Sequence, residues 1–225
     1  MRNQLNNIFI IFIFLFSLVS VFPESNSIGY ISSLTLPWYS GGGWDDFLED
    51  SSQELSPTAV ENTSLIGFSL GLIAVSPINR SLSLRCEVLL SAQGGGYTFE
   101  YPNGDSDANL ISEINLGIPF SLKVNVLSVQ NNVLYLIGGL QMSALLSQAE
   151  YAQQGAVFNK TKLDRDDFSI LNFSWIGGIG VDVPHRDHII FLELSYLRET
   201  DSTLIIYENV HQNVLKMSCG IRWVL

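Results

Sequence analysis

Hydrophobic and polar residues alternate along eight segments of the chain. Successive side chains of a β-strand point to opposite faces, so this period of two predicts strands with one apolar face and one polar face. Most of the segments contain about ten to fifteen residues, enough to cross a membrane as tilted strands. They are Ile28–Ser40, Thr63–Val75, Ser81–Gln93, Asn109–Lys123, Val133–Leu146, Phe168–Asp182, Ile189–Arg198 and Val214–Leu225.

The first and last segments decide whether such a sheet can close. Val214–Leu225 alternates cleanly, with Cys219, Ile221 and Trp223 on a wholly apolar face, whereas Ile28–Ser40 is the least regular of the eight. The two must pair to remove the edges of the sheet. Pro119 lies inside the fourth segment, and we expect a bulge or local irregularity there because proline donates no hydrogen bond to a ladder.

The connectors between these segments alternate in length. Membrane barrels have short turns on the periplasmic side and long loops outside. The pattern therefore predicts an all-β fold, an eight-stranded antiparallel up-and-down transmembrane β-barrel with both termini on the periplasmic side. The long connectors are Gly41–Asn62, Gly94–Ala108, Ser147–Asp167 and Glu199–Asn213, the short ones are Ser76–Arg80 and Val183–His188, and Val124–Asn132 is intermediate.

The N-terminus has the pattern of an export signal. Arg2 precedes an apolar run, Ile8–Phe22, which is shorter than the roughly 20 residues of a spanning helix. Small residues at Ser25 and Ser27 predict cleavage after Ser27, which divides the chain into a signal peptide, 1–27, and a barrel domain, 28–225. An uncleaved membrane anchor is the alternative.

Composition supports a membrane barrel. The chain is 47% hydrophobic and only 15% charged, and alternate residues of a transmembrane barrel bury such apolar surface in lipid. Cys86 and Cys219 both belong to apolar faces of strands that are not neighbours, so we expect two small apolar side chains and no disulfide.

Short motifs resemble those of a known family. Ser64–Gly71, the Pro77–Asn79 turn, Leu82–Glu87, Ile118–Phe120, Gly177–Val181 and Leu192–Tyr196 are similar to segments of the outer membrane β-barrel (PorT-like, "porin family") proteins of diderm bacteria. The spacing of the last residues also resembles the C-terminal sorting signal of such barrels, with Leu in place of the usual final Phe. This resemblance implies the bacterial outer membrane, its lipids and lipopolysaccharide, and the barrel-assembly machinery as partners. The signal positions are Ser218, Gly220, Trp223 and Leu225.

The polar faces of the strands predict a charged lumen. Three acids and three bases on one enclosed surface can neutralise one another, and an eight-stranded barrel is just wide enough for its side chains to fill it. We therefore expect a structural plug of ion pairs, with a narrow pore as the alternative. The six residues are Arg85, Glu87, Glu113, Lys123, Glu193 and Arg222.

Acidic residues are concentrated in the first long connector. The net charge of −11 makes nucleic acid an unsuitable partner. A solvated, self-repelling loop is the simplest explanation of these charges. The alternative is a site for Ca²⁺ or Mg²⁺, which carboxylate oxygens suit and which could bridge the loop to lipopolysaccharide. No EF-hand spacing occurs, and we assign no metal and no cofactor. The acids are Asp45, Asp46, Glu49, Asp50, Glu54 and Glu61.

Aromatic residues fall near the predicted strand ends. Interfacial girdles of Trp and Tyr are typical of membrane barrels, and packing in an aromatic core is the alternative. The outer group is Trp38, Tyr39, Trp44, Tyr97, Phe99, Tyr101 and Tyr207, and Trp223 lies near the other end.

The sequence offers little for catalysis. His185 and His188 share a short turn, and His211 lies near the start of the last strand. No G-x-S-x-G or P-loop motif is present. We therefore predict no enzyme but a structural or surface-interaction protein with a plugged lumen. The alternatives are a narrow porin, an outer-membrane lipid-modifying enzyme or protease using His211, and a soluble lipocalin-like binder with an apolar interior.

Overall fold

The computed structural model describes residues 26–40, 59–101, 105–154, 157–161, 171–200 and 211–225. These ranges form nine β-strands, and none of them contains a helix long and apolar enough to cross a membrane. The strands are β1 (Ser27–Ser40), β2 (Ala59–Pro77), β3 (Leu82–Glu100), β4 (Ser106–Val129), β5 (Asn132–Gln154), β6 (Val157–Thr161), β7 (Leu171–His185), β8 (His188–Glu199) and β9 (His211–Val224).

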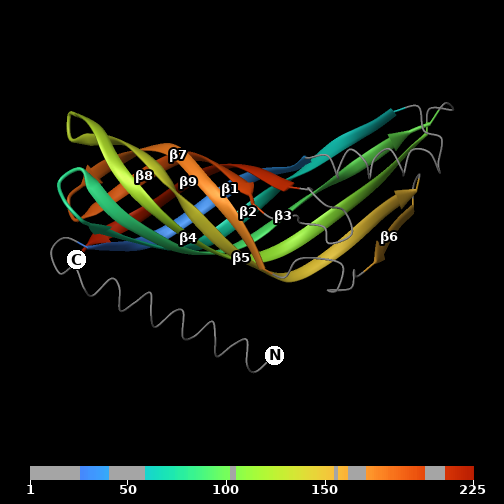
Figure 1. Cartoon of the computed structure of the whole chain (residues 1–225), viewed down its shortest axis with the longest axis horizontal. Helices are drawn as coiled ribbons and strands as arrows, with labels where there is room; N and C mark the ends of the chain where they lie inside the picture. The colour runs from blue at the N-terminus through green and yellow to red at the C-terminus, as the bar shows by residue number, and fades with distance from the viewer. Residues whose placement is uncertain (1–25, 41–58, 102–104, 155–156, 162–170, 201–210) are drawn as a thin grey trace, which may run out of the picture.

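Eight of the strands close into an antiparallel ring (Figure 1). Sequential neighbours pair around the barrel, β5 pairs with β7, and β1 pairs with β9. This last seam runs from Ser27 opposite Val224 to Ser40 opposite His211. The short strand β6 pairs only with the end of β5 and lies outside the ring. The predicted eight-stranded barrel is confirmed, including the pairing of the irregular first segment with the last.

One wall of the barrel is taller than the other. β2, β3, β4 and β5 run past the ends of β1, β7, β8 and β9 at the long-loop end (Figure 1). Pairing of β3 with β4 continues as far as Glu100 opposite Ser106. The predicted connector Gly94–Ala108 is therefore mostly strand, and so is Val124–Asn132. These two predictions were wrong because backbone pairing continues through the glycine and polar residues of the first connector and up to a two-residue turn in the second.

The β4–β5 hairpin turns through only two residues. Gln130 and Asn131 both have positive φ, 50° and 74°. A two-residue loop with both residues left-handed is the type I′ geometry, whose twist matches that of the flanking strands.

Three register shifts and one interruption mark the tall wall. The register shifts between Leu65 and Phe68 of β2, between Ile114 and Asn115 of β4, where β5 carries the extra residue of a bulge, and between Asn125 and Leu127 of β4. Pairing between β3 and β4 is interrupted next to Pro119 and resumes in the same register at Leu89 opposite Gly117. Pro119 thus produces a local irregularity, as expected, but no bulge.

The two faces of the wall differ as a membrane barrel requires. Outward positions are apolar and exposed, for example Tyr30 at 61% and Met217 at 58%. Inward positions carry most of the buried polar and charged residues. The lipocalin-like alternative is therefore wrong, because it needs an apolar interior.

The first strand begins one residue earlier than the predicted segment Ile28–Ser40. β1 starts at Ser27, whose Oγ accepts a hydrogen bond from Arg222 at 3.0 Å. Asn26 is also buried, and it accepts hydrogen bonds from Ser76 Oγ and from the backbone N–H of Leu225, both at 2.8 Å. The predicted signal peptide otherwise falls on residues 1–25, outside the described part of the chain.

Candidate functional site

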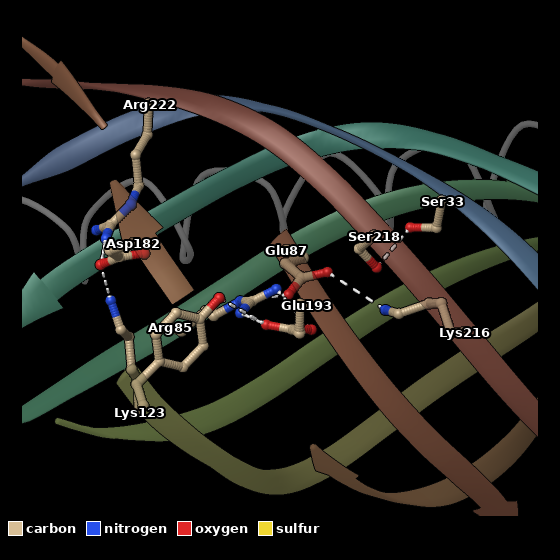
Figure 2. A network of polar contacts seen from close by, with 10 residues as sticks. Ser33, Arg85, Glu87, Lys123, Asp182, Glu193, Lys216, Ser218 and Arg222 are labelled. Atoms are coloured by element: carbon tan, nitrogen blue, oxygen red, sulfur yellow. Dashed lines mark hydrogen bonds and ion pairs between the residues drawn. The ribbon is translucent and has the colours of Figure 1, made fainter. Parts of the chain in front are cut away.

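The lumen is filled by charged side chains from strands on opposite sides of the ring (Figure 2). At its centre Arg85 of β3 donates through Nε to Glu87 Oε1 at 2.5 Å and through both Nη atoms to Glu193 of β8. Arg85 and Glu87 are each 1% exposed. Lys216 of β9 approaches from the other side, with Nζ 3.8 Å from Glu87 Oε2. Buried charges are tolerated only when they are paired in this way.

A second ion-pair centre lies nearer the short-turn end. Asp182 of β7 accepts hydrogen bonds from Lys123 of β4 and Arg222 of β9 through the same carboxylate oxygen. Tyr135 of β5 joins the two centres. Its hydroxyl donates to Glu193 Oε2 at 3.1 Å, and Lys123 Nζ lies 4.2 Å from the centre of its ring. Together the two centres, which we call the plug, are Arg85, Glu87, Lys123, Tyr135, Asp182, Glu193, Lys216 and Arg222.

Glycines make room for the large rings beside the plug. A Cβ on Gly180 would lie 2.4 Å from Tyr135 Cζ, and one on Gly220 would lie 2.5 Å from Phe191 Cζ. The Phe191 ring in turn lies beneath Arg85, whose Cζ is 5.7 Å from the ring centre. The strand sequences therefore place small residues where the lumen must hold an aromatic ring.

A separate polar layer lies toward the long-loop end. Glu113 accepts hydrogen bonds from the Tyr39 hydroxyl and from Asn115 Nδ2, both at 3.2 Å, and from Gln148 Nε2 at 3.4 Å. The β5 bulge puts one extra residue before Gln148, so that Gln148 rather than Ser147 points inward. This layer is held by neutral donors, unlike the plug.

A small cavity of about 30 Å³ lies among the polar residues of the lumen. Thr35, Ser69, Gln212 and Lys216 contribute to its lining, and each has a side-chain atom with no hydrogen-bond partner among the described residues. The volume suits one or two water molecules.

All six charges predicted for the lumen are buried in the barrel interior. Five of them form the plug, whereas Glu113 belongs to the separate polar layer. Tyr135, Asp182 and Lys216 complete the plug and were not among the predicted lumen residues, although their inward parity within predicted strands was available from the sequence. Glu199 is also buried and faces inward, and it was missed because it was placed in a connector.

The aromatic prediction is partly wrong. Tyr39, Tyr97 and Phe99 are buried, with the rings of Tyr97 and Phe99 5.1 Å apart. They face inward because they have the parity of the lumen side. Trp38 and Trp223 do face outward, and Tyr101 lies just past β3; Trp44 and Tyr207 fall outside the described residues.

The residues of the predicted sorting signal occupy both faces of β9. Ser218 is buried and shares a hydrogen bond of 2.9 Å with Ser33 of β1. Gly220 lies against Phe191, Trp223 packs edge-on against Tyr30 with ring centres 6.0 Å apart, and Leu225 is 74% exposed. Ser218 and Gly220 thus serve the interior of the barrel, and the sorting role of the four residues stays a prediction.

The remaining candidates do not gather into a site. Cys86 and Cys219 are free thiols on the outer surface. The rings of His185 and His188 lie 5.2 Å apart across the β7–β8 turn, and His211 lies opposite Ser40 at the other end of the barrel. Within the described ranges no group of three or more His, Cys, Asp or Glu residues could hold a metal ion. Of the acidic loop, only Glu61 is described.

Known proteins resemble the chain in architecture. Solved structures that it matches include Ail, the attachment invasion locus protein of Yersinia pestis (12% identity, 89% of this chain and 99% of that one, TM-score 0.41). They also include OprG of Pseudomonas aeruginosa (9% identity, 90% and 96%, TM-score 0.48) and Neisserial surface protein A (14% identity, 88% and 97%, TM-score 0.41).

Sequence comparison gives the family. No curated protein matches the chain. The family profile described as "Outer membrane protein beta-barrel domain" matches residues 46–198, more than half of the sequence. The closed ring, the apolar outer wall and this match together show that the chain belongs to the outer membrane protein β-barrel domain family and resides in the bacterial outer membrane.

Proposed function

We propose that this barrel has a structural or surface-interaction role and that it does not conduct. The plug is the observation that carries the proposal. Arg85 and Glu193 stand on opposite sides of the ring and are joined directly, and both are nearly inaccessible to solvent. Opening a path through the lumen would separate buried opposite charges, which costs several kcal/mol, about 3–5 for one partner.

Single-channel recording in planar bilayers tests the closed lumen. We expect the purified, refolded barrel to give no steady conductance, and heat-modifiable migration on SDS gels to verify that the same preparation is folded. A double variant, Arg85→Ala with Glu193→Ala, removes the central pair and should produce openings. Large, steady currents from the unaltered protein would contradict the proposal and favour the narrow porin.

The surface partners belong to the same proposal. The membrane location suggests lipid and lipopolysaccharide as neighbours and the barrel-assembly machinery as the partner that inserts the barrel. We also propose that the protein is a PorT-like barrel. Divalent cations bound to the acidic loop would bridge it to lipopolysaccharide. Melting of lipopolysaccharide-bound protein should then rise with Ca²⁺ and fall with EDTA, and an unchanged transition would exclude the bridge.

Catalysis is not part of the proposed function. His211 faces Ser40 across the β1–β9 ladder, but the Ser40 hydroxyl oxygen accepts a hydrogen bond of 2.6 Å from Asn213. We expect the protein to show no lipid-deacylating or peptide-cleaving activity. Activity that disappears in His211→Ala would establish the enzyme alternative.

A further inference from the structure

One charged side chain faces outward on the shorter wall of the barrel. On β1, β7, β8 and β9, all of whose residues are described, every other Asp, Glu, Lys or Arg has inward parity. Arg198 lies between Leu197 and Glu199, which are both buried toward the lumen, and its own side chain is exposed. The inward charges are Asp182, Glu193, Glu199, Lys216 and Arg222. A charge on the lipid face of a barrel destabilises it by about 2–4 kcal/mol at the bilayer midplane and much less at an interface.

Aromatic side chains flank Arg198 along a row of directly paired positions. Trp175 of β7 and Asn213 of β9 lie opposite Arg198, and Trp38 of β1 lies opposite Asn213. Trp175 is 63% exposed, and the ring centre of Trp38 is 6.1 Å from that of Tyr196. Trp and Tyr at such positions are typical of the membrane–water interface. The row therefore lies where lipid headgroups begin, at the long-loop end.

A chain of hydrogen bonds runs beside this row. The Tyr196 hydroxyl donates to Asn213 Oδ1, and Asn213 Nδ2 donates to Ser40 Oγ, each at 2.6 Å. Asn213 is only 3% exposed although it has outward parity. Because Ser40 accepts from Asn213, its hydroxyl hydrogen is available to an acceptor outside the wall.

We propose that Arg198, with the Ser40 hydroxyl nearby, binds a phosphate group of lipopolysaccharide in the outer leaflet. The long-loop end faces outward in barrels of this type. Guanidinium groups bind phosphate through paired hydrogen bonds, and no outward acid on these four strands opposes an anion there. The exposed Trp175 ring and the apolar wall below it would contact the acyl chains.

This inference rests on the outer-membrane location and not on the closed lumen. A barrel that conducts could still bind the lipid at its outer wall, and a closed barrel could fail to bind it. Conductance and lipid binding are therefore separate measurements, and failure of one leaves the other standing.

Native mass spectrometry of the full-length, folded barrel in maltoside micelles tests the site. The probes are bisphosphorylated lipid A, the same lipid A after phosphatase treatment, and phosphatidylglycerol. We expect the unaltered protein to retain bisphosphorylated lipid A about fivefold more than the dephosphorylated form, since one cation near anionic lipid contributes a factor of this size. Arg198→Gln should abolish the preference, and Arg198→Lys should keep part of it. Arg186→Gln, a matched change in the short turn at the opposite end, should leave the preference intact.

Two results would overturn the proposal. One is an unaltered protein that retains both forms of lipid A equally, or phosphatidylglycerol as well as lipid A. The other is Arg198→Gln with the same preference as Arg186→Gln. Heat-modifiable migration verifies that each variant is folded. If Arg198→Gln does not fold, the comparison between the unaltered protein and Arg198→Lys decides, and equal preferences in those two would count against a guanidinium site.

Discussion

At the residue scale, Arg85 is the position of the plug where a substitution should destabilise the barrel most. Arg85 neutralises two carboxylates, those of Glu87 and Glu193, and touches the Phe191 ring as well. Lys216 approaches only one of these acids and at a longer distance. Removal of Arg85 therefore leaves buried negative charge that no other described side chain is placed to compensate fully.

We expect Arg85→Met to destabilise the barrel by about 3–5 kcal/mol, because it leaves unpaired buried carboxylates. The double change Arg85→Met, Glu193→Gln removes the central pair of charges, leaves Glu87 paired with Lys216 and should recover most of the loss. Urea unfolding in lipid vesicles measures both. Arg80→Met, in the exposed β2–β3 turn, is the control and should unfold as the parent does. A double variant no more stable than the single one would show that charge pairing is not the cause.

Parity alone predicted much of the interior. It placed Arg85, Glu87 and Glu193 on one face because strand side chains alternate strictly, and the same rule applied without omission would have found Asp182 and Lys216. Parity could not predict which of the inward side chains contact one another. Glu113 shares the inward face but lies in a separate layer with Tyr39, because the distance along the barrel axis depends on strand register. The inward Tyr97 and Phe99 were assigned to a girdle because they fell in the predicted connector Gly94–Ala108, where no strand parity applies; β3 in fact continues to Glu100.

At the scale of elements, strand ends were the least predictable feature. The sequence between Gly94 and Ala108 is rich in glycine and polar residues, which normally mark loops. In the barrel these residues continue β3 and β4 above the membrane, where cross-strand pairing needs no apolar face. The pairing of β1 with β9 was predictable only from closure, since the pattern of β1 itself is irregular.

The β4–β5 hairpin offers a test of turn geometry. Both turn residues are left-handed, which Asn and Gly adopt more readily than Gln. We expect Gln130→Asn with Asn131→Gly to stabilise the barrel by about 0.5–1 kcal/mol, the usual gain when a left-handed position receives a suitable residue. Gln130→Val should instead destabilise the barrel, because a β-branched residue adopts positive φ poorly. Thermal unfolding followed by loss of heat-modifiable migration would measure both changes.

The start of β1 limits where the predicted signal peptide can be cleaved. Asn26 and Ser27 are hydrogen-bonded to Ser76, Leu225 and Arg222. Cleavage after Ser27 would remove these contacts, so we expect the mature protein to begin at Asn26 or earlier. Mass spectrometry of the intact mature protein gives its first residue directly. A mature chain that starts at Ile28 would show that the barrel closes without both residues.

At the scale of the whole molecule, the two ends of the barrel differ in height and in chemistry. The short-turn end carries compact hairpins and the Trp223–Tyr30 pair, while the long-loop end carries the tall wall of β2–β5 (Figure 1). The apolar outer band between them fixes how the molecule sits across the membrane. The family and the outer-membrane location follow from this architecture and the sequence match.

The orientation can be measured with single cysteines in a background in which Cys86 and Cys219 are replaced by Ser. Asp105→Cys, at the tip of the tall wall, should react with a membrane-impermeant maleimide on intact cells. Asp187→Cys, in the β7–β8 turn, should react only after the outer membrane is permeabilised. Both native positions are exposed, so access is limited only by the membrane. Labelling of Asp187→Cys on intact cells would mean that the barrel is inverted.

The seam between β1 and β9 also has a kinetic consequence. Its partners are very distant in sequence, as with Ser33 and Ser218, which are 185 residues apart. Each of the other neighbouring strand pairs of the ring is joined by a much shorter stretch of chain. Contacts between distant residues form slowly, because the loop-closure entropy is lost before the contact is gained. We therefore expect pairing of β1 with β9 to limit the folding rate. Until this pairing forms, both strands expose unpaired backbone groups at the edges of the sheet.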